Sequence, residues 1–226
     1  MHTAPDATAA PTTAEAVKPR LRGWLHLAAF PAVIIAGLLL VATGPTESAR
    51  LAAAVYAAAS ASLFGVSALY HRTDLTPTAT VRLKRCDHAN IYLIIAGTYT
   101  PIAHLALEGT ARIAILTTVW AGTAAGVAFR VLWTGAPRWL YTGLYILLGW
   151  IALAVLPQLS AGAGTAAVIL IVAGGILYTA GGVVYALKRP DPAPRWFGFH
   201  EVFHSLTLAA YIAQFAAVAL VVQNAA

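Results

Sequence analysis

Apolar residues occur along this chain in long runs, separated by short segments that carry charge, proline or glycine. A helix that crosses a membrane needs about 20 mostly apolar residues. Runs of this length predict seven spans, with ends expected to be correct to about 2–4 residues. The predicted spans are 24–42, 49–70, 88–107, 112–132, 139–156, 165–187 and 199–222. We therefore predict an all-α membrane protein, a seven-transmembrane helix bundle that forms one domain over residues 21–226.

The segments outside the runs have their own composition. Residues 1–20 are rich in alanine, proline and threonine without periodicity, which predicts a disordered tail. The clearest breaks between spans are 157–164 (PQLSAGAG) and 188–195 (KRPDPAPR), because proline and glycine interrupt helices. Gly122 and Gly126 form a GxxxG pattern in the fourth span, and further glycines crowd the sixth. Bare backbone at these positions allows close helix packing.

The composition favours a membrane protein over a soluble one. Of the 226 residues, 60% are hydrophobic and 10% are charged, and the mean hydropathy is +0.76. Soluble domains are about 45–50% apolar and about 25% charged. The net charge of +6 does not indicate nucleic-acid binding, because the Lys and Arg residues lie between apolar runs. A soluble enzyme and a nucleic-acid-binding domain are excluded.

The basic residues also predict an orientation. Twelve Lys and Arg residues lie in the tail and in the second, fourth and sixth connections, whereas the other side has only Arg50 and Arg112. Connections rich in Lys and Arg remain in the cytoplasm. The N-terminus is therefore predicted to be cytoplasmic and the C-terminus to lie outside.

Three segments bring unusual polar residues to the predicted cytoplasmic side. Ser67 and His71 end the second span, Asp87 opens the third, and His200 and His204 begin the seventh. Ionisable groups within membrane helices are costly and normally face the bundle interior. Residues four apart share one helix face, so His200 and His204 can bind one ion. Three His ligands with an open position are typical of catalytic zinc, and Asp87 can hold the water there, ligate directly or orient a ligand.

Each of these residues has a structural alternative. A His pair near a helix end can extend to the lipid headgroups, and Ser67 can serve helix packing. Asp87 can be the N-cap of its helix. The predicted convergence of three segments at one depth favours a metal site over these separate roles.

The last of these segments, HEVFH, also fits the HExxH pattern, in which two His bind zinc and the Glu acts as general base. We expect Glu201 instead to be a carboxylate at the level of the headgroups. His26 and His104 lie near span ends without a partner at helical spacing, and we interpret both as interfacial.

The chain resembles a known family in three motifs that occur in order on the second, third and seventh spans. They are SALYHR (67–72), DHANIYLIIAGTYTP (87–101) and HEVFH (200–204). On these motifs and the seven-span layout, it resembles the hemolysin III branch of the progestin and adipoQ receptor (PAQR) family. The resemblance implies a multi-pass protein of a bacterial plasma membrane with a zinc ion near the cytoplasmic side.

The resemblance also implies residue roles. His71, His200 and His204 would bind the zinc, Asp87 would contact the water at the zinc, and Ser67 would be the motif serine beside it. The family's relatives include adiponectin receptors and alkaline ceramidases, whose similar sites imply metal-dependent hydrolysis of lipid amides.

Our leading hypothesis is a zinc hydrolase of a lipid at the cytoplasmic leaflet. In it Asp87 is the general base, and Ser67 hydrogen-bonds the developing oxyanion. The alternatives are a non-enzymatic membrane sensor or receptor with structural zinc, and an HExxH intramembrane metalloprotease in which Glu201 is the base. Membrane lipid is the expected partner. The sequence specifies neither the substrate nor the oligomeric state.

Overall fold

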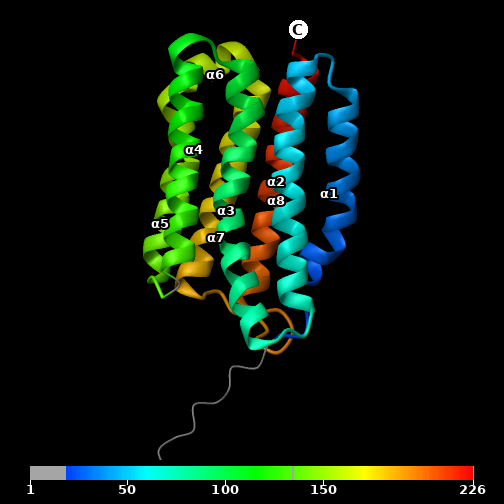
Figure 1. Ribbon diagram of the computed structural model, residues 1–226, viewed down its shortest axis with the longest axis vertical. Coiled ribbons are helices and arrows are strands. Elements are labelled where there is room, and N and C mark those ends of the chain that lie inside the picture. Colours follow the sequence, from blue (N-terminus) through cyan, green and yellow to red (C-terminus); the bar gives the residue numbers. More distant parts are fainter. Residues whose placement is uncertain (1–18, 134, 226) are drawn as a thin grey trace, which may run out of the picture.

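The computed structural model describes residues 19–133 and 135–225, and its regular elements there are helices. In chain order they are α1 (Trp24–Thr43), α2 (Glu47–Arg72), α3 (Pro77–Ala106), α4 (Gly109–Leu132), α5 (Arg138–Gly149), the 3₁₀-helix η1 (Ile151–Val155), α6 (Leu156–Ala163), α7 (Thr165–Leu187) and α8 (Phe199–Gln223). The long helices run side by side along the long axis of the molecule (Figure 1). The predicted disordered tail lies outside the described residues, except for Pro19 and Arg20.

The predicted seven-transmembrane bundle is confirmed. Six stretches of the described chain are long and apolar enough to cross a membrane: α1, α2, α4, α7, α8 and the combined stretch Arg138–Ala163. The seventh helix, α3, spans 30 residues but carries several charged residues before its apolar half. The start of α1 and the end of α8 lie at opposite ends of the bundle, as an odd number of crossings requires (Figure 1).

The third helix begins earlier than its predicted span. Its first residue is Pro77, three turns before residue 88. Proline is tolerated in the first turn of a helix, and the Thr76 hydroxyl caps it by accepting a hydrogen bond from the Ala79 amide at 3.3 Å. Charged residues such as Arg82 end a membrane span by hydropathy, but they do not end a helix. The prediction from apolar length therefore missed the polar part of α3.

The predicted break at 157–164 is wrong over most of its length. The chain passes from α5 through η1 into α6 and turns only at Gly164, whose φ is 81°. Pro157 lies in the first turn of α6, where its missing amide hydrogen costs nothing.

Close helix packing at the predicted glycines is confirmed. A Cβ atom at Gly126 of α4 would lie 2.3 Å from the ring of Tyr92 on α3. At Gly174 of α7, a Cβ would lie 2.7 Å from the Gln214 amide on α8. Side chains from the central helices thus fill the space that these glycines leave.

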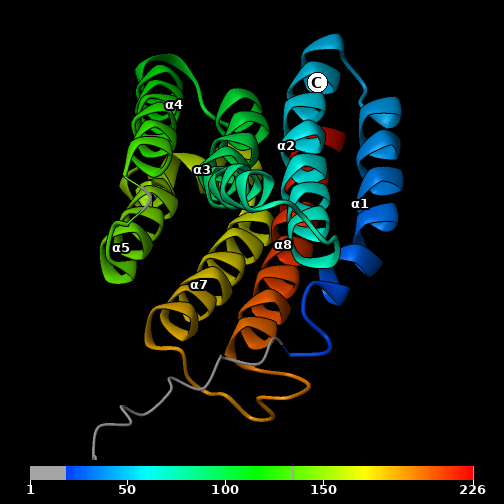
Figure 2. The ribbon, with the colours of Figure 1, turned by 60° about the horizontal axis from the view of Figure 1, so that its bottom comes forward.

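Basic residues gather at one end of the bundle, where α1 and α8 begin and α2, α4 and α7 end. Figure 2 looks toward this basic end and shows α1 and α2 on one side of the molecule and α4 and α5 on the other. The Lys and Arg residues of the described chain at this end are Arg20, Arg22, Arg72, Arg82, Lys84, Arg85, Arg130, Arg138, Lys188, Arg189 and Arg195. Of the Lys and Arg residues that the structure describes, only Arg50 and Arg112 lie at the other end.

Candidate metal centre and adjoining cavities

Three histidines meet at the basic end, inside the bundle. His71 lies in the last turn of α2, and His200 and His204 lie in the first two turns of α8. One ring nitrogen of each lies within 4.8 Å of one ring nitrogen of the others. His71 and His204 are buried and His200 is half-buried. The structure thus brings together the three histidines that the sequence suggested as metal ligands.

The spacing of these nitrogens suits a metal ion. The Nε2 atoms of His71 and His200 are 3.2 Å apart. Two imidazole nitrogens bound at about 2.0–2.1 Å to one tetrahedral ion lie about 3.3 Å apart. Without a metal, the same distance fits a hydrogen bond between the rings. The three histidines can therefore hold a metal ion between α2 and α8.

Asp87 and Ser67 lie beside the histidines. The Ser67 side chain, buried on α2, lies beside the Asp87 carboxylate, and both residues line the same cavity. Asp87 and His200 line the same two cavities. Asp87 is not an N-cap, because α3 begins ten residues earlier. It is also outside the group of donor atoms that meet within 4.8 Å.

Glu201 is a buried structural group, so the expectation of a carboxylate at headgroup level is wrong. Its side chain is 2% exposed. One carboxylate oxygen accepts a hydrogen bond from the backbone amide of Gly198, which caps α8, and the other forms an ion pair with Arg22. This arrangement orients the first turn of α8, which carries the His pair.

The ion pair leads to an asymmetric prediction for stability. Arg22→Gln will lower the free energy of unfolding by about 3–5 kcal/mol, because a buried carboxylate loses its counter-charge. Glu201→Gln will cost about 1–3 kcal/mol, because Arg22 is 18% exposed and reaches water. Denaturation of both purified variants in one detergent measures the difference. An equal loss of stability, or a larger one for Glu201→Gln, would contradict the predicted asymmetry between the two partners of the ion pair.

His26 joins this cluster, which corrects its interfacial interpretation. It is 3% exposed, and its ring stacks on His204 with centroids 3.8 Å apart and planes at 2°. Its ring also meets Phe64 edge-on. The predicted topology indicated only that His26 lies at the same end of the bundle as His204, because α1 and α8 both start there. The lateral packing that stacks the His26 ring on the His204 ring could not be predicted from the sequence.

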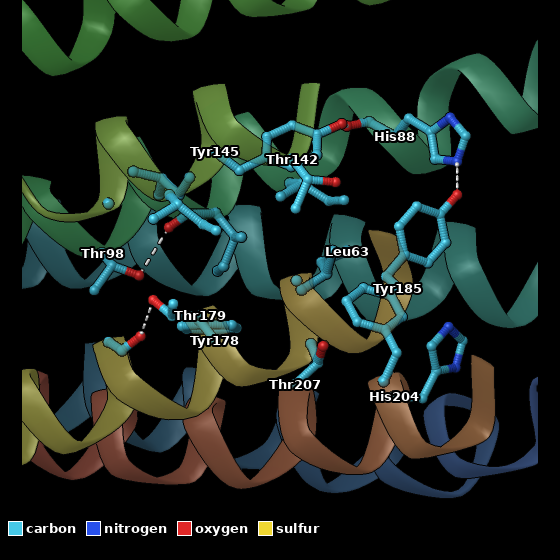
Figure 3. Close-up of a pocket in the computed structure, with 18 of the residues that line it drawn as sticks. Leu63, His88, Thr98, Thr142, Tyr145, Tyr178, Thr179, Tyr185, His204 and Thr207 are labelled. Carbon is cyan, nitrogen blue, oxygen red and sulfur yellow. Dashed lines mark hydrogen bonds between the residues drawn. The ribbon is translucent and has the colours of Figure 1, made fainter. Parts of the chain in front are cut away.

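A cavity extends from the histidines into the bundle between α3, α5, α7 and α8. Figure 3 shows His204, Thr207 and Tyr178 among the residues around it. On α8 its lining runs from His200 to Gln214, a rise of about 21 Å. Most of its surface is apolar and aromatic. We call it the apolar cavity.

A second cavity lies on the side of the basic end and has a polar lining. It shares Asp87, His88, Tyr141, Tyr185 and His200 with the apolar cavity. We call it the mouth. The predicted site residues therefore lie where a polar entrance meets an apolar interior.

These features define a class: a multi-pass helical membrane protein with a buried three-histidine site at one end of its bundle. The family model described as "Haemolysin-III related" matches residues 14–215. The chain belongs to this family and is a multi-pass integral membrane protein.

Two curated relatives are similar over most of their length. The "Hemolysin-3 homolog" of Bacillus subtilis (strain 168) is 33% identical over 163 residues, which is 69% of this chain and 74% of the relative. The "Hemolysin-3" of Bacillus cereus is 30% identical over 159 residues, 70% of this chain and 72% of the relative. Both relatives are bacterial.

Proposed function

We propose that the protein is a zinc-dependent hydrolase that cleaves the acyl amide bond of a membrane lipid. One observation carries the proposal: the three histidines and Asp87 lie where the polar mouth meets a long apolar cavity. A lipid has the same division into a polar group, a cleavable bond and an apolar chain. With the chain in the apolar cavity, its amide would lie near the histidines.

Zinc suits the donor set. His71, His200 and His204 offer three imidazole nitrogens in a buried setting, and no carboxylate of the described residues joins them within the same distance. Three neutral nitrogen donors and an open position match catalytic zinc. Zinc bound there would polarise the lipid carbonyl and make a water molecule more acidic.

Asp87 and Ser67 have separate roles in this proposal. Asp87 accepts the proton of the attacking water as general base. The Ser67 hydroxyl has a single hydrogen, and its contact with Asp87 favours holding that carboxylate over donating to an oxyanion. Ser67 is therefore a positioning residue here.

Two other functions are weighed against this one. A structural metal in a sensor would also join α2 to α8, but three donors beside a cavity favour an open site over a closed one. In a metalloprotease of the HExxH type, Glu201 would be free to accept a proton. Both of its oxygens are engaged, by Arg22 and by Gly198, and this favours Asp87 as the base.

The test is hydrolysis of N-acyl lipids, including ceramides, by the purified protein in detergent. We expect release of fatty acid, its loss with a metal chelator and its return on adding zinc. A preparation with both His200 and His204 replaced by alanine is the control for contaminating enzymes. Full zinc loading without cleavage of any N-acyl lipid would favour the sensor.

We also propose that the basic end faces the cytoplasm. Its support is the imbalance of Lys and Arg between the two ends of the bundle. A reporter that is active only in the cytoplasm should work when fused before residue 19 and fail when fused after Ala226. Cytoplasmic activity of both fusions would contradict this orientation and the odd number of crossings.

A further inference from the structure

The lining of the mouth has more positive than negative side chains. Four cationic residues line it: Arg22, Lys84, Arg130 and Arg138. Arg22 is paired with Glu201, and Asp87 is the acidic residue among the described lining residues. Three cations therefore face one carboxylate in a cavity that leads into a membrane protein.

Arg130 is the most unusual of these cations. It lies in the last turn of α4 and is 2% exposed. One guanidinium nitrogen donates to His88 Nδ1 at 2.6 Å, and the group lies 4.3 Å from the centroid of the Tyr141 ring. Its Nε and Nη1 atoms are buried without a hydrogen-bond partner in the described part of the chain.

None of these contacts supplies a negative charge. Arginine has only donors, so His88 Nδ1 must accept the hydrogen bond, which makes His88 the neutral tautomer. Its Nε2 lies 3.4 Å from the Tyr185 hydroxyl, the contact drawn in Figure 3. A buried charge is costly unless it is paired, and a ring face offsets only part of that cost. An anion in the mouth would complete the pairing.

Arg138 and the start of α5 point to the same kind of ligand. Arg138 is the first residue of α5, and its guanidinium lies 5.1 Å from the centroid of the Tyr185 ring. Its Nη1 atom is buried without a hydrogen-bond partner among the described residues. Pro137 before it provides no side-chain cap, and the first turn of α5 contains no acidic residue. The first amides of a helix attract anions, and phosphate in particular.

We propose that the mouth binds a phosphate group through Arg130, Arg138 and the first turn of α5. Two guanidinium groups and a helix start suit an anion with several oxygens around one centre. Because the mouth adjoins the apolar cavity, the phosphate of a lipid headgroup fits here with its chain inside. This proposal deepens the proposed function. Only the interpretation of the phosphate as part of a substrate headgroup rests on that function.

The test is binding to the purified full-length protein. Three probes are compared: dihexanoyl phosphatidic acid, inorganic phosphate, and dihexanoylglycerol, which has the same chains without phosphate. We expect phosphatidic acid to bind and dihexanoylglycerol to bind at least tenfold more weakly. Arg130→Gln should weaken phosphatidic acid binding about 10- to 100-fold, as expected for the loss of a charged hydrogen-bond partner. Arg112→Gln, in the same helix at the other end, should leave it unchanged.

Two further variants keep the result interpretable. Arg138 is less buried than Arg130, so Arg138→Gln is expected to fold even if Arg130→Gln does not. It should also weaken binding of phosphatidic acid. The variant with both His200 and His204 replaced by alanine should still bind phosphatidic acid, because the arginines and not the metal hold the phosphate. This arm also separates failure of the phosphate site from failure of the hydrolase proposal.

The two phosphate probes distinguish the source of the ligand. Binding of phosphatidic acid well above that of inorganic phosphate supports a lipid headgroup, and equal binding supports free phosphate in the same site. Equal affinity of wild type, Arg130→Gln and Arg138→Gln for phosphatidic acid would overturn the proposal. So would loss of that binding in the histidine variant together with its retention in both arginine variants.

Discussion

Replacing both His200 and His204 by alanine will abolish stoichiometric metal binding. The wild-type protein, purified without chelator, is expected to contain about one zinc per chain. The variant should contain almost none, because His71 alone cannot hold the ion. Elemental analysis of protein purified in parallel measures both values.

Two other histidines are matched controls for this experiment. His104 lies at the opposite end of the bundle, where its ring contacts Ser48. His26 stacks on His204, but its ring nitrogens are not among the donors that meet at the site. Alanine at either position should leave about one zinc per chain. Full zinc content in the double variant would refute the assignment of the ligands.

Replacing Asp87 by asparagine will lower the hydrolysis rate about 10²–10⁴-fold while the zinc remains bound. Asparagine keeps the shape of the side chain but cannot accept the proton from water, and loss of a general base has this typical cost. Turnover of the best N-acyl lipid, measured with zinc content on the same samples, is the readout. Ser67→Ala should have a smaller effect, because Ser67 acts through Asp87.

Glu201→Gln is the matched carboxylate control. It should keep most of the activity per folded molecule, because Glu201 caps α8 and pairs with Arg22. The opposite pattern would be a mild Asp87→Asn, an inactive Glu201→Gln and cleavage of a transmembrane peptide. It would make the protein a protease of the HExxH type.

The bundle could be predicted from the sequence because the membrane fixes how long an apolar run must be. That rule found the helices but not their polar extensions, so α3 was expected at residue 88 and begins at Pro77. The proline and glycine content predicted a break where α6 forms, because it took no account of the position of Pro157 in the first turn of that helix.

For the site, helical spacing and topology could place residues at one depth. This was enough to expect His71, His200 and His204 together. The lateral packing of helices is not encoded in hydropathy, so the stacking of His26 on His204 was missed. Arg130 was likewise counted only as a charge that sets topology, whereas the structure buries it. Its depth was predictable, but its neighbours were not.

The contact between His71 and His200 joins residues that are 129 positions apart in the chain. During synthesis, α2 enters the membrane long before α8 exists. The metal site is therefore incomplete until the last helix is inserted. If the three histidines hold a metal ion, its loading would belong to the end of biogenesis, and a chain truncated before α8 would lack two of the three donors. An ion bound by all three would thus mark a chain that has been made and assembled through its final helix.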